Sequence, residues 1–258
     1  MADRLGGLRL IYRIPWLLLH IVIGTPLTVL CQGRAGRAIR FGQRSLSDIA
    51  IRWWASTSCR IFGVRRRIFG NIPPGAQLVV ANHIAWIDIQ LLHSVSAMGF
   101  VAKYEISTWP IVGWLAKVGG TVFHQRGSHD SASGVASAMI QRLEEDGKVA
   151  IFPEGGILPG GRVKMFHARL FGAAIETNVP VQPVALRYLR DGATYHDITF
   201  LPGEKTLDNF FRLLKQCPCI GEIHVLPVIE SQDKKRRELA GEAEAAVRAA
   251  YEGARIVD

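Results

Sequence analysis

Residues 77–88 read QLVVANHIAWID, and this stretch decides the fold that we expect of the chain. Its first part, QLVVA, is a short apolar run, and the turn-forming sequence NIPPG at 71–75 comes just before it. A run of this kind, bounded by Gly and Pro, is typical of a buried strand. The remainder, NHIAWID, leads into a segment that we expect to be helical from about Trp86. The chain therefore passes here from a strand to a helix through a polar turn.

Outward from this stretch, short apolar runs alternate with helical patterns. We expect further strands at 99–104, 119–125, 148–153, 180–188, 198–203 and 222–229, and helices at 130–145, 168–178 and 233–252. The run KVAIFP at 148–153 is mostly apolar, as in a strand that is buried on both faces of a parallel sheet. Strands that alternate with helices predict an α/β fold, with a largely parallel central sheet flanked by helices.

The composition is that of a globular chain with a large core. Of its 258 residues, 48% are hydrophobic and 21% are charged, which excludes a disordered charged tail. Glycine and proline show no collagen-like repeat, so a fibrous protein is excluded as well. The four cysteines, in a chain far larger than a small disulfide scaffold, favour a reducing compartment.

The net charge of +9 comes from the N-terminal quarter. Residues 1–67 hold twelve arginines, no lysine and only two acids, Asp3 and Asp48. A basic surface attracts either nucleic acid or anionic lipid. These arginines adjoin an apolar run of membrane length, and the sequence has no zinc-finger or RNA-binding signature. We therefore expect membrane lipids as partners, and no nucleic acid.

The apolar run is IPWLLLHIVIGTPLTVLCQG, residues 14–33, which contains no Asp, Glu, Lys or Arg. A run of about 20 residues is long enough to span a bilayer. Arginines flank both of its ends, so the positive-inside rule gives no orientation. We favour a segment that dips into the membrane and returns, because both flanks then stay on the cytoplasmic face. A single spanning helix and a buried helix of a soluble protein are the alternatives.

A group of arginines follows this run at steps of three and four residues: Arg34, Arg37, Arg40 and Arg44. On a helix they would form one basic stripe. With the interfacial aromatic residues Trp53 and Trp54 nearby, the composition suits a helix that lies on an anionic leaflet. An ordinary solvated arginine face is the alternative. We assign residues 1–60 to N-terminal membrane-attachment helices and residues 61–258 to the domain that carries the chemistry.

The polar turn after the first strand carries His83 and Asp88, five residues apart. Two residues at this spacing do not share a face of a regular helix, but a turn can bring them together. Histidine titrates near neutrality and can act as a general base. A carboxylate on its second ring nitrogen would fix the tautomer and stabilise the imidazolium that forms. The alternative is a capped helix with a structural histidine.

Two further turns carry charged groups. The sequence FPEGG at 152–156 follows the buried strand, which places Glu154 at the carboxyl end of a parallel sheet, where it could hold a substrate. Arg126 closes the run GGTVFHQRG at 119–127 and could pair with Glu154 or bind an anion. Taken singly, each could also be an ordinary surface residue.

In their order and spacing, these features resemble the glycerolipid acyltransferase family, typified by 1-acylglycerol-3-phosphate acyltransferases. The resemblance rests on NH-x4-D at 82–88, the strand that ends in Arg126, FPEG at 152–155 and VPVQPVAL at 179–186. A weaker similarity extends from about residue 61 to 230. The family also carries N-terminal membrane-associating helices, in agreement with the charge pattern, and residues 61–258 would be its acyltransferase domain.

The resemblance implies a membrane-bound O-acyltransferase, which moves a fatty acyl group from acyl-CoA or acyl carrier protein to the free hydroxyl of a lysolipid. His83 would be the general base, and Asp88 would orient it and stabilise its charged form. Arg126, Glu154 and Gly155 match family positions linked to acceptor binding. The first candidate acceptor is 1-acylglycerol-3-phosphate, which would give phosphatidic acid. The expected location is the cytoplasmic face of the cell membrane.

One departure from the family bears on the acceptor. The family usually continues FPEG with Thr and Arg, whereas Gly156 and Ile157 stand here. Arg162 and Lys164 come later and could supply the missing charge. The departure keeps open another acceptor, such as a lyso-ornithine lipid, which carries no phosphate.

The sequence predicts no metal and no cofactor other than the acyl donor as co-substrate. Its histidines at 124, 129 and 167 lack partners at zinc spacing. The alternative to an enzyme is a non-catalytic lipid-binding membrane protein on the same fold.

Overall fold

Strand β4 (Gln77–Ala81) lies inside one large sheet in the computed structural model, which describes residues 5–108, 112–124, 129–145, 147–157 and 162–253. Within these residues the sheet has eight strands, in the spatial order β3 (Val64–Phe69), β10 (Cys219–Val225), β8 (Val181–Arg190), β4, β7 (Lys148–Ile151), β5 (Gly99–Lys103) and β6 (Val122–His124), with β9 (Ala193–Thr194) paired to β8. Strands β8, β4, β7, β5 and β6 are parallel, whereas β10 and β3 run in the opposite direction. The predicted α/β fold with a largely parallel sheet is confirmed.

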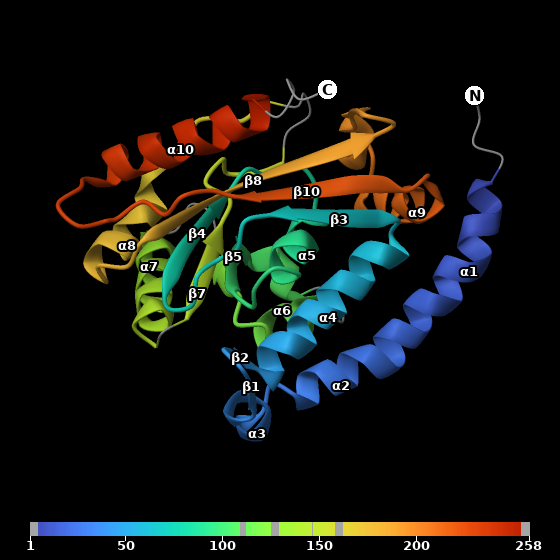
Figure 1. Ribbon diagram of the computed structural model, residues 1–258, viewed down its shortest axis with the longest axis horizontal. Coiled ribbons are helices and arrows are strands. Elements are labelled where there is room, and N and C mark those ends of the chain that lie inside the picture. Colours follow the sequence, from blue (N-terminus) through green and yellow to red (C-terminus); the bar gives the residue numbers. More distant parts are fainter. Residues whose placement is uncertain (1–4, 109–111, 125–128, 146, 158–161, 254–258) are drawn as a thin grey trace.

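Both faces of the sheet are covered by helices (Figure 1). Along β4, Val79 and Ala81 point into one core, and Leu78 and Val80 into the other. The first core is closed by α4 (Leu46–Ile61), α5 (Asp88–His93) and α9 (Thr206–Lys215). The second is closed by α7 (His129–Glu144), α8 (Gly172–Glu176) and α10 (Arg236–Gly253). Because β4 is buried on both faces, its sequence is apolar without alternation.

Short elements connect these layers. They are the 3₁₀ turns η2 (Tyr104–Thr108), η3 (Ala168–Phe171) and η4 (His196–Ile198), and α6 (Val112–Val118). The strand predicted at 198–203 is wrong, because only Ile198 and Thr199 are buried there, Leu201 is exposed, and Pro202 has no N–H to donate to a sheet. The helix predicted at 168–178 is divided between η3 and α8.

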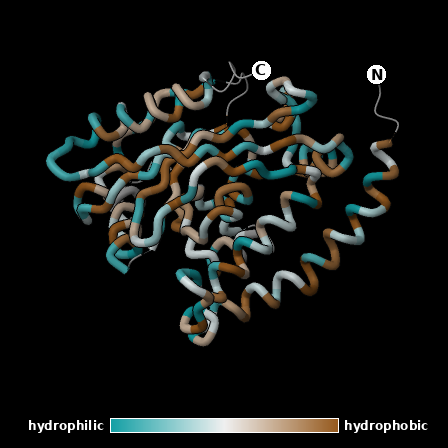
Figure 2. The backbone as a smooth tube through the Cα atoms, in the orientation of Figure 1, coloured by the Kyte–Doolittle hydropathy of each residue, from teal (hydrophilic) through white to brown (hydrophobic). Residues whose placement is uncertain are grey.

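The N-terminal apolar run lies in one helix of 25 residues, Gly6–Leu30, made of α1 (Gly6–Leu19), the π-helical turn η1 (His20–Gly24) and α2 (Thr25–Leu30). Hydrophobic residues recur along it, as the hydropathy colouring of Figure 2 shows. Only 22% of its most apolar window is buried, so the interpretation as a buried helix of a soluble protein is wrong. By length and composition it could cross a membrane.

The chain does not turn back within residues 14–33, so a reversal inside this run is wrong, whereas its path in the membrane stays a prediction. Pro26 has no N–H to donate to the preceding turn, and the π-helical turn His20–Gly24, whose His20 carbonyl accepts the N–H of Thr25, lies directly before it; the helix continues to Leu30. The reversal follows through α3 (Arg34–Ala38) and the hairpin of β1 (Arg40–Phe41) and β2 (Arg44–Ser45), and α4 then returns to the sheet (Figure 1).

The expected helical stripe of arginines is therefore also wrong. Arg34 and Arg37 lie on α3, whereas Arg40 and Arg44 lie on the two strands of the hairpin. The helix ends at Ala38 because Ile39 is extended, and Gly42, with a φ of 61°, then turns the hairpin. The four side chains are nevertheless exposed, and they share one end of the molecule.

Candidate active site

The turn after β4 folds around the side chain of Asp88, the first residue of α5. The backbone N–H groups of Ile84 and Ala85 donate to Oδ2 of Asp88 at 2.6 and 2.9 Å. These bonds reverse the chain within one turn. His83 Nδ1 therefore reaches the same carboxylate oxygen, at 2.9 Å. The structure brings together the two residues that sequence analysis paired.

The imidazole of His83 is held in one orientation. Its ring stacks on Phe152, with 3.9 Å between the centroids and an interplanar angle of 12°. Since a carboxylate accepts a bond at Nδ1, that nitrogen carries the proton, and Nε2 keeps its lone pair. None of the residues that the structure describes bonds Nε2. The His83 side chain is 14% exposed, so the imidazole is not sealed inside the core.

The carboxylate of Asp88 is fully buried, and its second oxygen also has a donor. The hydroxyl of Tyr188, from β8, donates to Oδ1 at 2.5 Å. Burial and the neighbouring Asp88 raise the pKa of the Tyr188 hydroxyl well above its usual range. Tyr188 therefore stays a neutral donor near physiological pH.

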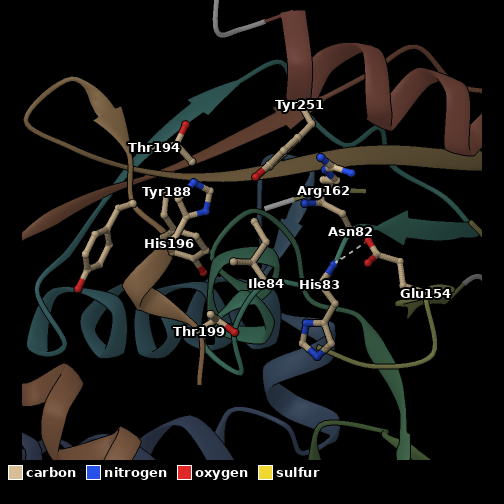
Figure 3. A pocket seen from close by; sticks show the side chains of 11 residues that line it. Asn82, His83, Ile84, Glu154, Arg162, Tyr188, Thr194, His196, Thr199 and Tyr251 are labelled. Carbon is tan, nitrogen blue, oxygen red and sulfur yellow. Dashed lines mark hydrogen bonds between the residues drawn. The ribbon is translucent and has the colours of Figure 1, made fainter. Parts of the chain in front are cut away.

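Glu154 lies in the turn after β7, beside the His83 turn. Its Oε1 accepts the backbone N–H of His83 at 3.3 Å, the bond drawn in Figure 3. Burial raises the pKa of the Glu154 carboxyl to about 7, although hydrogen bonds from the backbones of His83 and Lys164 oppose the rise. The turn itself needs Gly155, whose φ of 76° is in the left-handed region. Glu154 and Gly155 thus shape the site at the carboxyl end of the sheet.

A pocket opens between this turn and the segment that follows β8. His83, Glu154 and Arg162 all line it, together with Asn82, Ile84, Tyr188, Thr194, Tyr195, His196, Thr199 and Tyr251. Figure 3 shows Arg162 beside Tyr251, with the His83 ring directed away from both. A cation and an acid thus line one pocket next to the histidine turn.

The other predicted site residues have different outcomes. Arg162 lines the pocket, and its role in binding stays a prediction. Lys164 has an exposed side chain, and its backbone contributes the bond to Glu154. Arg126 lies outside the described residues. In the described ranges, no group of three or more His, Cys, Asp or Glu side chains could hold a metal ion.

Sequence analysis missed Asn82 and Tyr188 as parts of the site. Asn82 fixes the end of β4 to β8, since its side chain donates to the Leu186 carbonyl at 3.0 Å and accepts the Leu186 N–H at 2.8 Å. Tyr188 comes a hundred residues after Asp88, at the end of an apolar run. Nothing in such a run distinguishes a tyrosine that bonds a carboxylate from one that only fills a core.

Comparisons with known proteins agree with this geometry. A family model described as Acyltransferase matches residues 63–187. A lyso-ornithine lipid O-acyltransferase of Pseudomonas aeruginosa is 38% identical over 202 residues, which cover 78% of each chain. A 1-acyl-sn-glycerol-3-phosphate acyltransferase of Neisseria gonorrhoeae is 37% identical over 115 residues, 45% of each chain.

A solved structure has the same fold. The crystal structure of the 1-acyl-sn-glycerophosphate (LPA) acyltransferase PlsC from Thermotoga maritima superposes with a TM-score of 0.76. It covers 100% of this chain and 99% of its own, at 20% sequence identity.

The fold, the His–Asp turn and these relatives define an enzyme that transfers acyl groups to lysolipids. The chain belongs to the Acyltransferase family, and it is an acyltransferase of the lysophospholipid type.

Proposed function

We propose that this enzyme acylates a free hydroxyl of a lysolipid with His83 as the general base. The observation that carries the proposal is the 2.9 Å bond between His83 Nδ1 and Asp88 Oδ2, because it leaves Nε2 free to accept a proton. Asp88 orients the ring and stabilises the imidazolium. The stacked Phe152 keeps the ring from turning away.

The reaction is a direct transfer. The lysolipid hydroxyl loses its proton to Nε2 as its oxygen attacks the thioester carbonyl of acyl-CoA or acyl carrier protein. The tetrahedral intermediate then expels the thiolate, which takes the proton from the imidazolium. The products are an ester and a free thiol, and the histidine returns to its starting form. The thioester is the only co-substrate, and its carriers are cytosolic, so the reaction belongs on the cytoplasmic face of the cell membrane.

For the acceptor, we propose a lyso-ornithine lipid. The Pseudomonas relative, which is named a lyso-ornithine lipid O-acyltransferase, aligns with 78% of this chain. The Neisseria relative, which is named a 1-acyl-sn-glycerol-3-phosphate acyltransferase, aligns with 45%. Gly156 and Ile157 also replace the Thr and Arg with which the resembling family follows FPEG. With Glu154 and Arg162 on one pocket, the site offers an acid and a cation to a head group that carries both an ammonium and a carboxylate.

1-Acylglycerol-3-phosphate is the second candidate. Arg162 lines the pocket, Lys164 follows it two residues later, and Arg126 matches a position that the family resemblance links to acceptor binding, so these cations could bind a phosphate. An arginine with a phosphate makes a charge-assisted, bidentate pair, which is a strong contact.

The test compares the two acceptors with purified full-length protein in mixed micelles, with acyl-CoA and acyl carrier protein as alternative donors. We expect kcat/KM for the lyso-ornithine lipid to exceed that for 1-acylglycerol-3-phosphate by about tenfold or more, as a difference of one or two charged contacts implies. The reverse preference, with Arg162→Ala raising KM for the phosphate acceptor, would establish the second candidate instead.

A further inference from the structure

The hydrogen bond from Tyr188 to Asp88 joins the central strand β8 to the start of α5. Tyr188 lies one residue beyond the segment 63–187 that the family model matches. Its side chain is 1% exposed and belongs to the core between the sheet and α5. The hydroxyl reaches Oδ1 of Asp88 at 2.5 Å.

The neighbouring strand makes this contact possible. Tyr188 pairs with Gly221 of β10. A Cβ at Gly221 would lie 2.8 Å from Cγ1 of Val64 and 3.1 Å from the methyl groups of Leu91 on α5. Because glycine leaves that space free, α5 approaches the sheet closely, and its first residue comes within reach of Tyr188.

Among the described residues, the two carboxylate oxygens of Asp88 accept different numbers of hydrogen bonds. Oδ2 accepts the bonds from His83, Ile84 and Ala85, whereas Oδ1 accepts only Tyr188. The side chain of Asp88 is 0% exposed, so water cannot replace a lost donor at Oδ1. Tyr188 thus supplies the donor to Oδ1, and this bond fixes the plane of the carboxylate whose Oδ2 accepts the bond from His83.

We propose that Tyr188 is a positioning residue for the reaction, which acts through Asp88 on the basicity of His83. The proposal rests on the proposed function, because it needs His83 as the base. Tyr188 touches neither the hydroxyl nor the thioester. Its donated bond holds the carboxylate in place and spreads its negative charge, and so sets how strongly Asp88 Oδ2 interacts with His83 Nδ1.

The other titratable groups near Tyr188 and Asp88 come from three elements. They are Cys59 of α4, Cys219 of β10 and Glu154 of the turn after β7, and Arg66 of β3 interacts with Cys59 in turn. Burial raises the pKa of Cys59 to about 12 and that of Cys219 to about 11, so both thiols stay neutral near physiological pH. Arg66 keeps its charge, and Glu154 is the neighbour that titrates near neutrality.

The test is Tyr188→Phe in the purified full-length enzyme, with kcat and KM measured against pH. We expect kcat to fall about tenfold to a hundredfold, the range for loss of a bond to a charged group, with KM for the acceptor unchanged. The acidic limb of the pH–rate profile moves to higher pH by about one unit, because a carboxylate with one donor fewer favours protonation of its histidine partner.

Two further variants separate this role from a structural one. Site-specific 3-fluorotyrosine at 188 is a stronger donor and moves the acidic limb to lower pH, opposite to phenylalanine. Ser94→Ala removes another buried hydroxyl, at the far end of α5, where it bonds only the Leu91 carbonyl, and it leaves the profile in place. Profiles of both Tyr188 variants that coincide with the wild type would overturn the inference. Loss of activity in His83→Ala in the same assay would show that the proposed base itself still holds.

Discussion

Glu154 is a residue of the site whose protonation changes near neutral pH. Its side chain is buried between the turns that follow β4 and β7, and it accepts the backbone N–H of His83. Burial disfavours its charged form, so its pKa is raised from 4.5 to about 7. The folded protein therefore binds a proton on Glu154 between about pH 4.5 and 7 that the unfolded chain has released. The stability gained from this carboxyl is present below the unfolded value and is lost as the pH rises through about 7.

Glu154→Gln should remove this pH dependence, because glutamine resembles the protonated form. We expect the free energy of unfolding of the wild type, relative to the variant, to fall by roughly 2–4 kcal/mol between pH 5 and 8. Unfolding by denaturant in mild detergent, followed across this pH range, measures the difference. The control is Glu176→Gln at an exposed position on α8, for which the difference should stay constant. A constant difference for Glu154→Gln as well would contradict the assigned burial.

Among the elements, the helix formed by α1, η1 and α2 buries two basic side chains and exposes a row of apolar ones. The buried Arg13 donates to the carbonyls of Leu214 and Gln216 at the end of α9, at 2.9 and 3.0 Å. His20 Nε2 lies 3.1 Å from the Trp54 carbonyl of α4. The outer face exposes large apolar side chains, among them Leu8, Ile11, Leu18, Leu19, Val22, Ile23, Leu27 and Leu30. A face of this kind suits contact with lipid rather than water.

The four exposed arginines of α3 and the β1–β2 hairpin adjoin this apolar helix. Replacing Arg34, Arg37, Arg40 and Arg44 with Gln should weaken binding to anionic vesicles by about a hundredfold or more, since each basic side chain near an anionic surface contributes about 1 kcal/mol. Binding to neutral vesicles should change little, because the apolar face is intact. Co-sedimentation with vesicles of both compositions measures this.

The matched control for the arginines is Arg236→Gln with Arg237→Gln, at the exposed start of α10 on the opposite side of the molecule (Figure 1). This pair should leave vesicle binding unchanged. An equal loss on anionic and neutral vesicles after replacing the four arginines would mean that the attraction is not electrostatic.

For the whole molecule, the sheet and the turn between β4 and α5 could be predicted, whereas the path of the N-terminal segment could not. Apolar runs with turn residues at their ends predict strands such as β4 and β7, because burial on both faces removes polar residues from them. At 198–203 the same pattern misled, since an apolar run also fits a loop with two buried residues. The sequence of the N-terminal run fits a re-entrant, a spanning or a buried segment, because hydropathy does not show where a chain turns.

Prediction of the site from the sequence was limited in the same way. His83 and Asp88 are close in sequence, so the turn that unites them leaves a motif. Tyr188 and Asn82 take their roles from strand pairing, which joins β4 to β8 across about a hundred residues. Such contacts depend on the register of the sheet, and a single sequence does not state that register.

The central claim is that His83 removes a proton from the lysolipid hydroxyl, and one rate measurement tests it most directly. Purified His83→Ala protein, bound to vesicles as the wild type is, is assayed for acyl transfer to lyso-ornithine lipid and to 1-acylglycerol-3-phosphate. The matched control is His224→Ala on β10, a histidine outside the pocket. The account predicts that His83→Ala lowers kcat by about 10²- to 10⁴-fold for whichever acceptor the wild type uses, while the control stays active. Near wild-type turnover by His83→Ala would contradict it.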